Sequence, residues 1–129
     1  MVSVAQFMSR PSVTLDAETS IADACRLMGE KHVGSVLVSR NGVVVGIFTE
    51  RDLMSKLLLE RKDLASATLG SYASSPLVTV TPMTDIKEAA RIMTELRVRR
   101  LVVVQGGTPI GVFTSADLAR AVGKFPLDL

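Results

Sequence analysis

The chain has 129 residues with a formal net charge of +2, and 47% of them are hydrophobic and 22% charged. These values are typical of a globular protein and exclude a disordered or fibrous chain, which would need far fewer apolar residues or a strong compositional bias. With one cysteine and one histidine, the chain cannot build an internal disulfide framework or a Cys/His zinc cluster. This cysteine content favours a reducing cytoplasm as the location. The apolar runs are no longer than strands and predict neither a signal peptide nor a membrane span.

The first predicted elements are an extended segment and a helix. Residues 11–15 are expected to be extended, because Pro11 does not suit a helix interior. The helix is predicted to begin after Ser20, which has a capping-box spacing with Asp23. Its apolar residues have the i, i+3, i+4, i+7 spacing of one buried face: Ile21, Ala24, Cys25 and Met28. This spacing predicts a core position for Cys25 rather than a reactive thiol.

A hairpin and a second helix complete the first half. Asn41-Gly42 separates two runs rich in β-branched residues, and Asn-Gly between such runs is a strong hairpin signal. The runs cover residues 35–39 and 43–48. A helix is predicted after Thr49, with apolar positions at Leu53, Leu57 and Leu58.

The second half repeats the first at a constant offset of 65 positions, without a gap. Gly46 recurs as Gly111 and Asp52 recurs as Asp117, each 65 positions later in the sequence. The repeated helix stripe, hairpin turn and final apolar positions are Ile86, Ala89, Ala90 and Met93; Gly106-Gly107; and Leu118, Ala121 and Val122. Such a constant offset is the signature of one supersecondary unit present twice.

The repeat predicts an α+β fold. Two pseudo-symmetric β-α-β-β-α copies, over residues 1–64 and 66–124, are expected to pack sheet to sheet into one module, because a 60-residue unit is marginal alone. Residues 61–68 form a short polar linker between them. Pro109 falls in a predicted strand, where proline is tolerated at an edge or at the strand start.

The two copies of one motif have two interpretations. GIFTERD, from Gly46 to Asp52, returns as GVFTSAD, from Gly111 to Asp117. Thr-x-x-Asp at the start of a helix is an ordinary N-cap, which contributes about 1 kcal/mol. The same groups could bind a sugar phosphate, since a carboxylate accepts both hydroxyls of a ribose diol and a helix N-terminus attracts phosphate. Both interpretations can hold for one residue.

The sequence resembles the CBS domain, the motif named after cystathionine β-synthase, present as a tandem pair. The matching positions hold identical or similar residues 65 positions on and are Val13-Thr14, Ser20-Ile21, Ala24, Met28, Val38, Gly42, Val45 to Thr49, and Asp52-Leu53. The resemblance implies a stand-alone, non-catalytic regulatory module, or Bateman module, that senses an adenosine ligand in up to two clefts between the repeats. AMP, ADP or ATP is the expected ligand, with S-adenosylmethionine as an alternative, and a disc-shaped homodimer is the expected assembly.

The resemblance also implies roles for individual residues. Asp52 and Asp117 would accept the ribose hydroxyls, and Thr49 and Thr114 would face the ribose or the phosphate. Ile47 and Val112 would pack on adenine. One cleft would join Asp117 to Pro11 and Val33, and the other would join Asp52 to Pro76 and Val98.

The clefts are expected to differ in charge. The remaining predicted ligand residues are Arg99, Arg100 and Ser115 at the Asp117 cleft, and Arg51 at the Asp52 cleft. A solvated run of surface charge is the alternative interpretation of the arginines. Glu50 would oppose a phosphate unless a cation such as Arg51 offsets it. The Asp117 cleft is therefore predicted to bind the more anionic nucleotide.

Other functions stay open. The mild basicity and Arg97, Arg99 and Arg100 could serve a nucleic acid, which is disfavoured because aromatic residues for base stacking are few. A structural dimerisation module with empty clefts, or a partner of an unidentified regulated protein, is also compatible. An enzyme is least favoured, because neither a P-loop nor a catalytic or metal-ligating set is evident. His32 is either a pH-sensitive or phosphate contact or an exposed loop residue.

Overall fold

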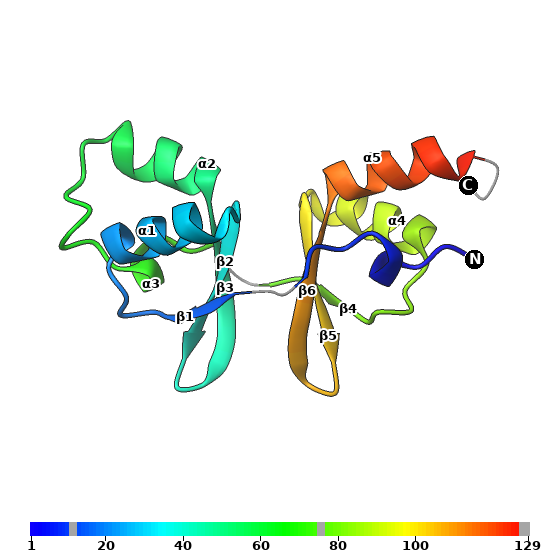
Figure 1. Ribbon diagram of the computed structural model, residues 1–129, viewed down its shortest axis with the longest axis horizontal. Coiled ribbons are helices and arrows are strands. Elements are labelled where there is room, and N and C mark those ends of the chain that lie inside the picture. The colour runs from blue at the N-terminus through cyan, green and yellow to red at the C-terminus, as the bar shows by residue number, and fades with distance from the viewer. Residues whose placement is uncertain (11–12, 75–76, 127–129) are drawn as a thin grey trace. The chain divides into compact units, whose positions relative to one another are not determined.

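The computed structural model describes residues 1–10, 13–74 and 77–126, so Pro11 and Pro76 lie outside the described residues. The chain divides into two compact units (Figure 1). We call Val13–Leu77 the first unit, and Met1–Ser12 together with Val78–Leu129 the second unit. Each unit contains one three-stranded sheet.

The first unit has the predicted order of elements. They are β1 (Thr14–Asp16), α1 (Ile21–Lys31), β2 (Ser35–Arg40), β3 (Val43–Thr49), α2 (Glu50–Asp52), η2 (Leu53–Leu58) and α3 (Leu69–Tyr72). β1 pairs with β2 in parallel, and β2 pairs with β3 antiparallel. The helix α1 is therefore the crossover of a β-α-β unit, and β2–β3 is a hairpin.

The second unit repeats this arrangement. Its elements are η1 (Val4–Gln6), β4 (Thr79–Val80), α4 (Ile86–Leu96), β5 (Arg100–Gln105), β6 (Thr108–Thr114) and α5 (Ser115–Lys124). β4 pairs with β5 in parallel, and β5 pairs with β6 antiparallel. The α+β class and the repeated β-α-β-β-α order are thus confirmed, while sheet-to-sheet packing of the repeats stays a prediction.

The hairpin turns confirm the turn signals. Asn41 and Gly42 have φ values of 51° and 79°, and Gly106 and Gly107 have φ values of 58° and 80°. Positive φ at both central residues defines the type I′ turn, whose twist matches that of the flanking strands. Pro109 lies in β6, an outer strand of its sheet, next to a register shift in the pairing with β5. This position agrees with the expected edge location.

Both long helices end on a residue in the left-handed conformation. His32 (φ 54°) ends α1, and Arg97 (φ 55°) occupies the equivalent position after α4. Glycine is the usual residue here, because it has no Cβ to clash with the following carbonyl. Each of these two side chains therefore costs stability at its helix end.

Replacing His32 with glycine is expected to raise the free energy of unfolding by about 1 kcal/mol, since the left-handed strain disappears. Lys31→Gly is the matched control: this exposed residue is the last helical residue of α1 and should cost about 1 kcal/mol. Urea denaturation followed by circular dichroism measures both. A loss of stability in His32→Gly would show that the imidazole makes a contact worth more than the strain.

Two segments pack in the unit opposite to their repeat copy. We call residues 2–9 and 67–74 the exchanged segments. In the second unit the N–H of Ile86, at the start of α4, donates to Val2 O (3.0 Å). In the first unit the N–H of Ile21 donates in the same way to Ala67 O (2.8 Å). The stretch expected to be a polar linker is therefore partly a structural element that caps α1.

The exchanged segments also bury side chains and extend the sheets. Val4 and Leu69, which are 65 positions apart, are both fully buried. Ser9 forms an antiparallel bridge with Val112 of β6, and Ser74 forms the equivalent bridge with Ile47 of β3. The helices η1 and α3 within these segments were not predicted.

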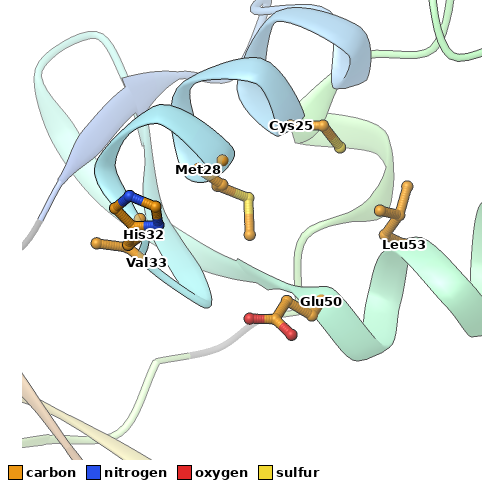
Figure 2. Close-up of a pocket in the computed structure, with 7 residues that line it drawn as sticks. Cys25, Met28, His32, Val33, Glu50 and Leu53 are labelled. Carbon is orange, nitrogen blue, oxygen red and sulfur yellow. The ribbon is translucent and has the colours of Figure 1, made fainter.

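A hollow of about 390 Å³ lies in the first unit, between α1 and the start of α2 and η2 (Figure 2). Its lining is Cys25, Met28, Gly29, His32, Val33, Glu50 and Leu53. Cys25 is half-buried and packs against the hydrophobic cluster of the unit, and burial raises the pKa of its thiol. The predicted core position of Cys25 is thus at the border of the core, where the thiol is weakly ionised.

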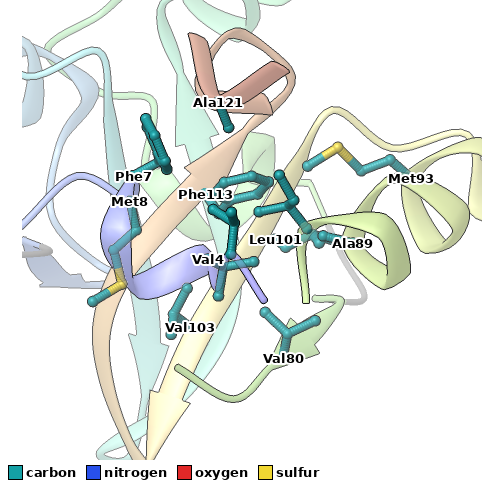
Figure 3. Packing of buried hydrophobic residues seen from close by; sticks show 12 residues of the cluster. Val4, Phe7, Met8, Val80, Ala89, Met93, Leu101, Val103, Phe113 and Ala121 are labelled. Atoms are coloured by element: carbon teal, nitrogen blue, oxygen red, sulfur yellow. The ribbon is translucent and has the colours of Figure 1, made fainter. Parts of the chain in front are cut away.

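Each unit has its own hydrophobic cluster. In the second unit, Phe113, Leu101 and Val103 from the sheet meet Met93 from α4 and Val4 from the exchanged segment (Figure 3). In the first unit, the equivalent cluster is centred on Phe48 of β3 and includes Leu69. The predicted helix stripes are confirmed, because their first, second and last members are buried in both α1 and α4.

The final helices of the two copies differ. α5 is a regular α-helix, whereas α2 continues into the π-helix η2, where the N–H of Leu59 donates to Met54 O (3.1 Å). Of the apolar positions predicted in these two helices, Leu57 and Ala121 are fully buried, whereas Leu58 and Val122 are exposed.

Candidate functional site

The motif aspartate of the first unit caps its helix. The N–H of Thr49 donates to Asp52 Oδ2 (2.9 Å), and the hydroxyl of Thr49 is 3.1 Å from the same oxygen. The N–H of Asp52 donates in return to Thr49 Oγ1 (3.2 Å). This reciprocal pair is a capping box, and it holds Asp52, only 7% exposed, in a fixed position at the junction of β3 and α2.

The second unit contains the same box. The N–H of Thr114 donates to Asp117 Oδ2 (2.8 Å), and the N–H of Asp117 donates to Thr114 Oγ1 (3.2 Å). Asp117 is 6% exposed. The capping interpretation of Thr-x-x-Asp therefore holds in both copies, and in both it uses the same carboxylate oxygen.

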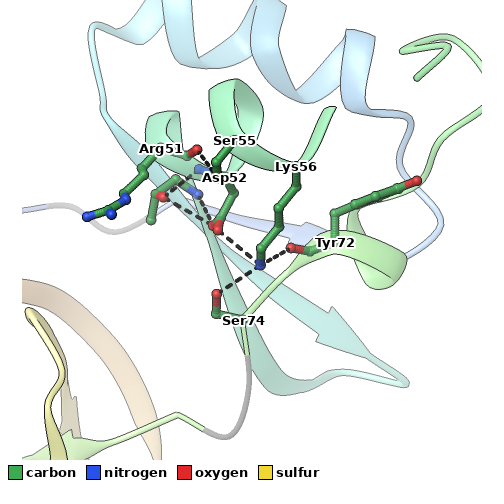
Figure 4. Close-up of polar contacts among 7 residues, drawn as sticks. Arg51, Asp52, Ser55, Lys56, Tyr72 and Ser74 are labelled. Carbon is green, nitrogen blue, oxygen red and sulfur yellow. Dashed lines mark hydrogen bonds and ion pairs between the residues drawn. The ribbon is translucent and has the colours of Figure 1, made fainter. Parts of the chain in front are cut away.

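The other carboxylate oxygen contacts a cation. Lys56 Nζ lies 3.1 Å from Asp52 Oδ1 and also donates to Tyr72 O (3.2 Å) and Ser74 Oγ (3.4 Å) (Figure 4). Arg120 Nη2 lies 2.8 Å from Asp117 Oδ1. An ionised carboxylate has about four acceptor positions. Capping and the ion pair thus leave each aspartate able to accept a further donor.

The basic residues predicted for the Asp117 site gather at the start of α5. The N–H of Ser115 donates to Arg99 O (3.0 Å), and Arg100 is the strand partner of Thr114. Arg99 is exposed and Arg100 is half-buried. Four of the predicted ligand residues are therefore brought together within one unit, beside Asp117.

The equivalent place in the first unit has the opposite charge. The N–H of Glu50 donates to Gly34 O (3.1 Å), and Ser35 is the strand partner of Thr49. A Cβ atom on Gly34 would lie 2.6 Å from Glu50 Oε1, so the Glu50 carboxylate occupies space that a side chain at position 34 would need. The predicted charge difference between the two sites is thus built into their strand-to-helix junctions.

The apolar site residues lie around these junctions. Val112 is buried and Ile47 is half-buried, and their backbones pair with the exchanged segments at Ser9 and Ser74. Val33 borders the hollow of the first unit. Val98 and Val33 pack against the clusters of their own units, so their predicted pairing with the aspartate of the other repeat stays a prediction.

Arg51 is exposed, and Figure 4 shows its side chain directed away from Lys56. The cation next to Asp52 is therefore Lys56, and neither Lys56 nor its counterpart Arg120 was among the predicted ligand residues. The sequence could have indicated both ion pairs, because Lys56 and Arg120 follow their aspartates by four and three positions, and residues at these spacings lie on one helix face.

None of the helices in the described ranges combines the length and the apolarity that a bilayer crossing requires. Within the same ranges, every buried side-chain nitrogen and oxygen has a hydrogen-bond partner. The two buried aspartates are thus stable as they stand, and a ligand is not needed to satisfy them.

Comparison with known proteins agrees with this architecture. The protein CBSX3 of Arabidopsis thaliana, described as mitochondrial and CBS domain-containing, is 31% identical over 110 residues, covering 81% of this chain and 53% of that protein. The chain therefore spans about half the length of this relative. A protein with CBS domains from Burkholderia ambifaria superposes with a TM-score of 0.81 at 31% identity, covering 94% of this chain and 93% of that one.

A further structure, the hexameric CBS-CP12 protein of bloom-forming cyanobacteria, has a TM-score of 0.87 at 26% identity and covers 98% of this chain and 74% of that one. A family model described as the CBS domain matches residues 4–59 and 69–124, which include both exchanged segments in large part. With two copies of the domain across most of its length, the chain belongs to the CBS-domain family.

Proposed function

We propose that the protein is a non-catalytic sensor of adenosine ligands, and that Asp117 and Asp52 each bind the ribose of one ligand. The observation that carries the proposal is the state of the two carboxylates. Each carboxylate is buried and is fixed by a capping box through Oδ2. Its Oδ1 contacts a long, partly exposed cation, Lys56 or Arg120, which a ligand can displace. A positioned carboxylate with free acceptor capacity suits a ribose diol.

The charges around the two sites favour different ligands. Arg99 and Arg100 adjoin the Asp117 site, so this site is proposed to take AMP, ADP or ATP. Glu50 adjoins the Asp52 site and repels phosphate, so this site is proposed to bind nucleotides weakly or to prefer a less anionic adenosyl ligand such as S-adenosylmethionine.

Binding is proposed to regulate contacts with a second copy of the chain or with another protein. A ligand changes such an equilibrium only to the extent that it binds the two states with different affinity. The hexameric assembly of the cyanobacterial relative shows that a protein with this domain pair can self-associate. The homodimer and the regulated partner are therefore the second part of the proposal.

Asp117→Asn is expected to weaken nucleotide binding by roughly ten- to a hundredfold, because an amide is a weaker acceptor for two hydroxyls than a carboxylate. Isothermal titration calorimetry with AMP, ADP, ATP and S-adenosylmethionine measures the affinities. Asp52→Asn tests the second site in the same way. Asparagine keeps a side-chain oxygen that can accept from the N–H of the N-cap threonine, so the substitution is milder for folding than alanine.

Asp23→Asn is the matched control for this titration. Asp23 also lies in the first turn of a helix and pairs with an arginine, Arg26, but it is exposed and is not part of the motif. Its replacement should leave every affinity unchanged. Absence of binding heat for all four ligands, with unchanged thermal stability at millimolar nucleotide, would overturn the sensor and favour a structural module with empty sites.

A further inference from the structure

Arg120 joins the motif aspartate to an exchanged segment. Its Nη2 atom lies 2.8 Å from Asp117 Oδ1 and 3.0 Å from Phe7 O, and its guanidinium carbon lies 5.6 Å from the centre of the Phe7 ring. The same group thus makes an ion pair, a charged hydrogen bond and a cation–π contact. Beyond the apolar packing of the cluster, Arg120 and the carboxylate that orients it supply a polar link between the exchanged segment 2–9 and α5.

Lys56 makes the same connection in the first unit. It bridges Asp52 Oδ1 and the carbonyl of Tyr72, and Tyr72 is the residue 65 positions after Phe7. The two cations do not occupy the same position of the repeat, because the residue 65 positions after Lys56 is Ala121, and the residue 65 positions before Arg120 is Ser55. Two different helix positions therefore reach equivalent oxygens.

The helix geometry accounts for the different positions. Arg120 reaches its aspartate from three residues along the regular helix α5, whereas Lys56 reaches from four residues along a segment that has become the π-helix η2. Residues three and four positions along a helix both lie on the face of the starting residue, so either spacing brings the cation to Oδ1 of the aspartate. The link is thus preserved although the helices differ.

We infer that Arg120 and Lys56 are latches that a ligand releases: a ribose diol that occupies Oδ1 of the aspartate displaces the cation and so loosens the exchanged segment. The ligand half of this inference rests on the proposed function above. Oδ2 is fixed by backbone N–H groups, whereas Oδ1 is held by side chains that are 63% exposed for Arg120 and 40% exposed for Lys56. Water readily replaces such partners, so Oδ1 is the oxygen open to exchange.

Release would have a defined consequence for the fold. Once Arg120 leaves Asp117, its guanidinium loses the ion pair that orients it toward the carbonyl of Phe7 and keeps only the cation–π contact with the Phe7 ring, so the adjacent bridge between Ser9 and Val112 loses support. Occupancy of the site is in this way coupled to the order of a segment that lies outside it. The coupling is reciprocal, so loosening the segment should also change ligand affinity.

The latch itself is tested without ligand, by amide hydrogen exchange at Ser9 and Val112 measured by NMR on the full chain. These two amides donate to each other's carbonyls at 2.9 and 3.2 Å. Arg120→Met keeps the length of the apolar stem and removes the charge, and should speed their exchange about three- to tenfold. Arg91→Met, which removes exposed ion pairs on α4 of the same unit, should leave their rates unchanged.

Release is tested by adding AMP, with 2′,3′-dideoxyadenosine monophosphate as the probe that lacks the diol. AMP at saturation should speed exchange of the same amides in the wild type but not in Arg120→Met, and the dideoxy compound should have no effect. If calorimetry shows that AMP binds but exchange of the Ser9 and Val112 amides is unchanged or slower, ligand binding does not release the latch, and the proposed function stands. If AMP does not bind, the exchange experiment uses whichever of ADP, ATP and S-adenosylmethionine binds by calorimetry, and if none of the four binds, the proposed function and the release both fail. Equal rates in Arg120→Met and Arg91→Met would overturn the latch in either case.

Discussion

Phe113→Ala is expected to lower the free energy of unfolding by about 3–5 kcal/mol, the cost of removing a fully buried aromatic ring and leaving a cavity. The ring lies at the centre of the second unit's cluster, between the sheet, α4 and the exchanged segment (Figure 3). Since small domains are stable by only about 5–15 kcal/mol, this single change removes a large part of the total. Urea denaturation followed by circular dichroism gives the value.

Two further variants show whether packing causes the loss. Phe113→Leu keeps most of the volume and should cost clearly less than the alanine variant. Phe48→Ala removes the equivalent fully buried ring in the first unit and should cost a similar amount, because both rings are completely enclosed in the cluster of their own unit. A loss below about 1 kcal/mol in Phe113→Ala would mean that the ring is not the packed centre of its unit.

Local signals in the sequence predicted the elements well. Asn41-Gly42 and Gly106-Gly107 form the expected type I′ turns, and the helix stripes of α1 and α4 are buried as their spacing required. These features depend on residues within one or two turns of each other. The capping boxes of the motif belong to the same class, since threonine and aspartate are three positions apart.

Features that depend on distant residues were not predictable in this way. The exchanged segments pack on the opposite repeat copy, and a polar stretch such as residues 61–68 contains no sign of that partner. The contact of Arg120 with the carbonyl of Phe7 spans 113 positions. The spacing of Arg120 to Asp117 could have suggested the ion pair, but the third member of the contact could not be found without the fold.

The motif glycines belong to this second class. Gly46 and Gly111 were recognised as the constant first residue of the motif, without a physical role. In the structure both are buried where an exchanged segment passes, at Ser74 and Ser9 respectively. Their role is therefore to admit another backbone, which is a use of glycine that is common in strands.

Gly111→Ala is expected to lower the free energy of unfolding by about 3 kcal/mol, at the upper end for an overpacked site. A Cβ atom on Gly111 would lie 2.7 Å from Ser9 O and 2.8 Å from Met8 Sδ. The methionine can move, but the carbonyl of Ser9 cannot without breaking its hydrogen bond with the N–H of Val112. Gly111 is not one of the glycines with positive φ, so the cost comes from the contact and not from the backbone conformation.

Gly123→Ala is the control and should have the opposite sign. Gly123 lies in α5 of the same unit with nothing within 4 Å of its Cβ position, so alanine should raise the free energy of unfolding by about 0.5–1 kcal/mol. Both values come from urea denaturation, and hydrogen exchange at Ser9 should be faster in Gly111→Ala alone. Equal stability of the two variants would show that residues 2–9 do not pass over Gly111 as closely as these distances require. The close packing of this segment on β6 would then be contradicted.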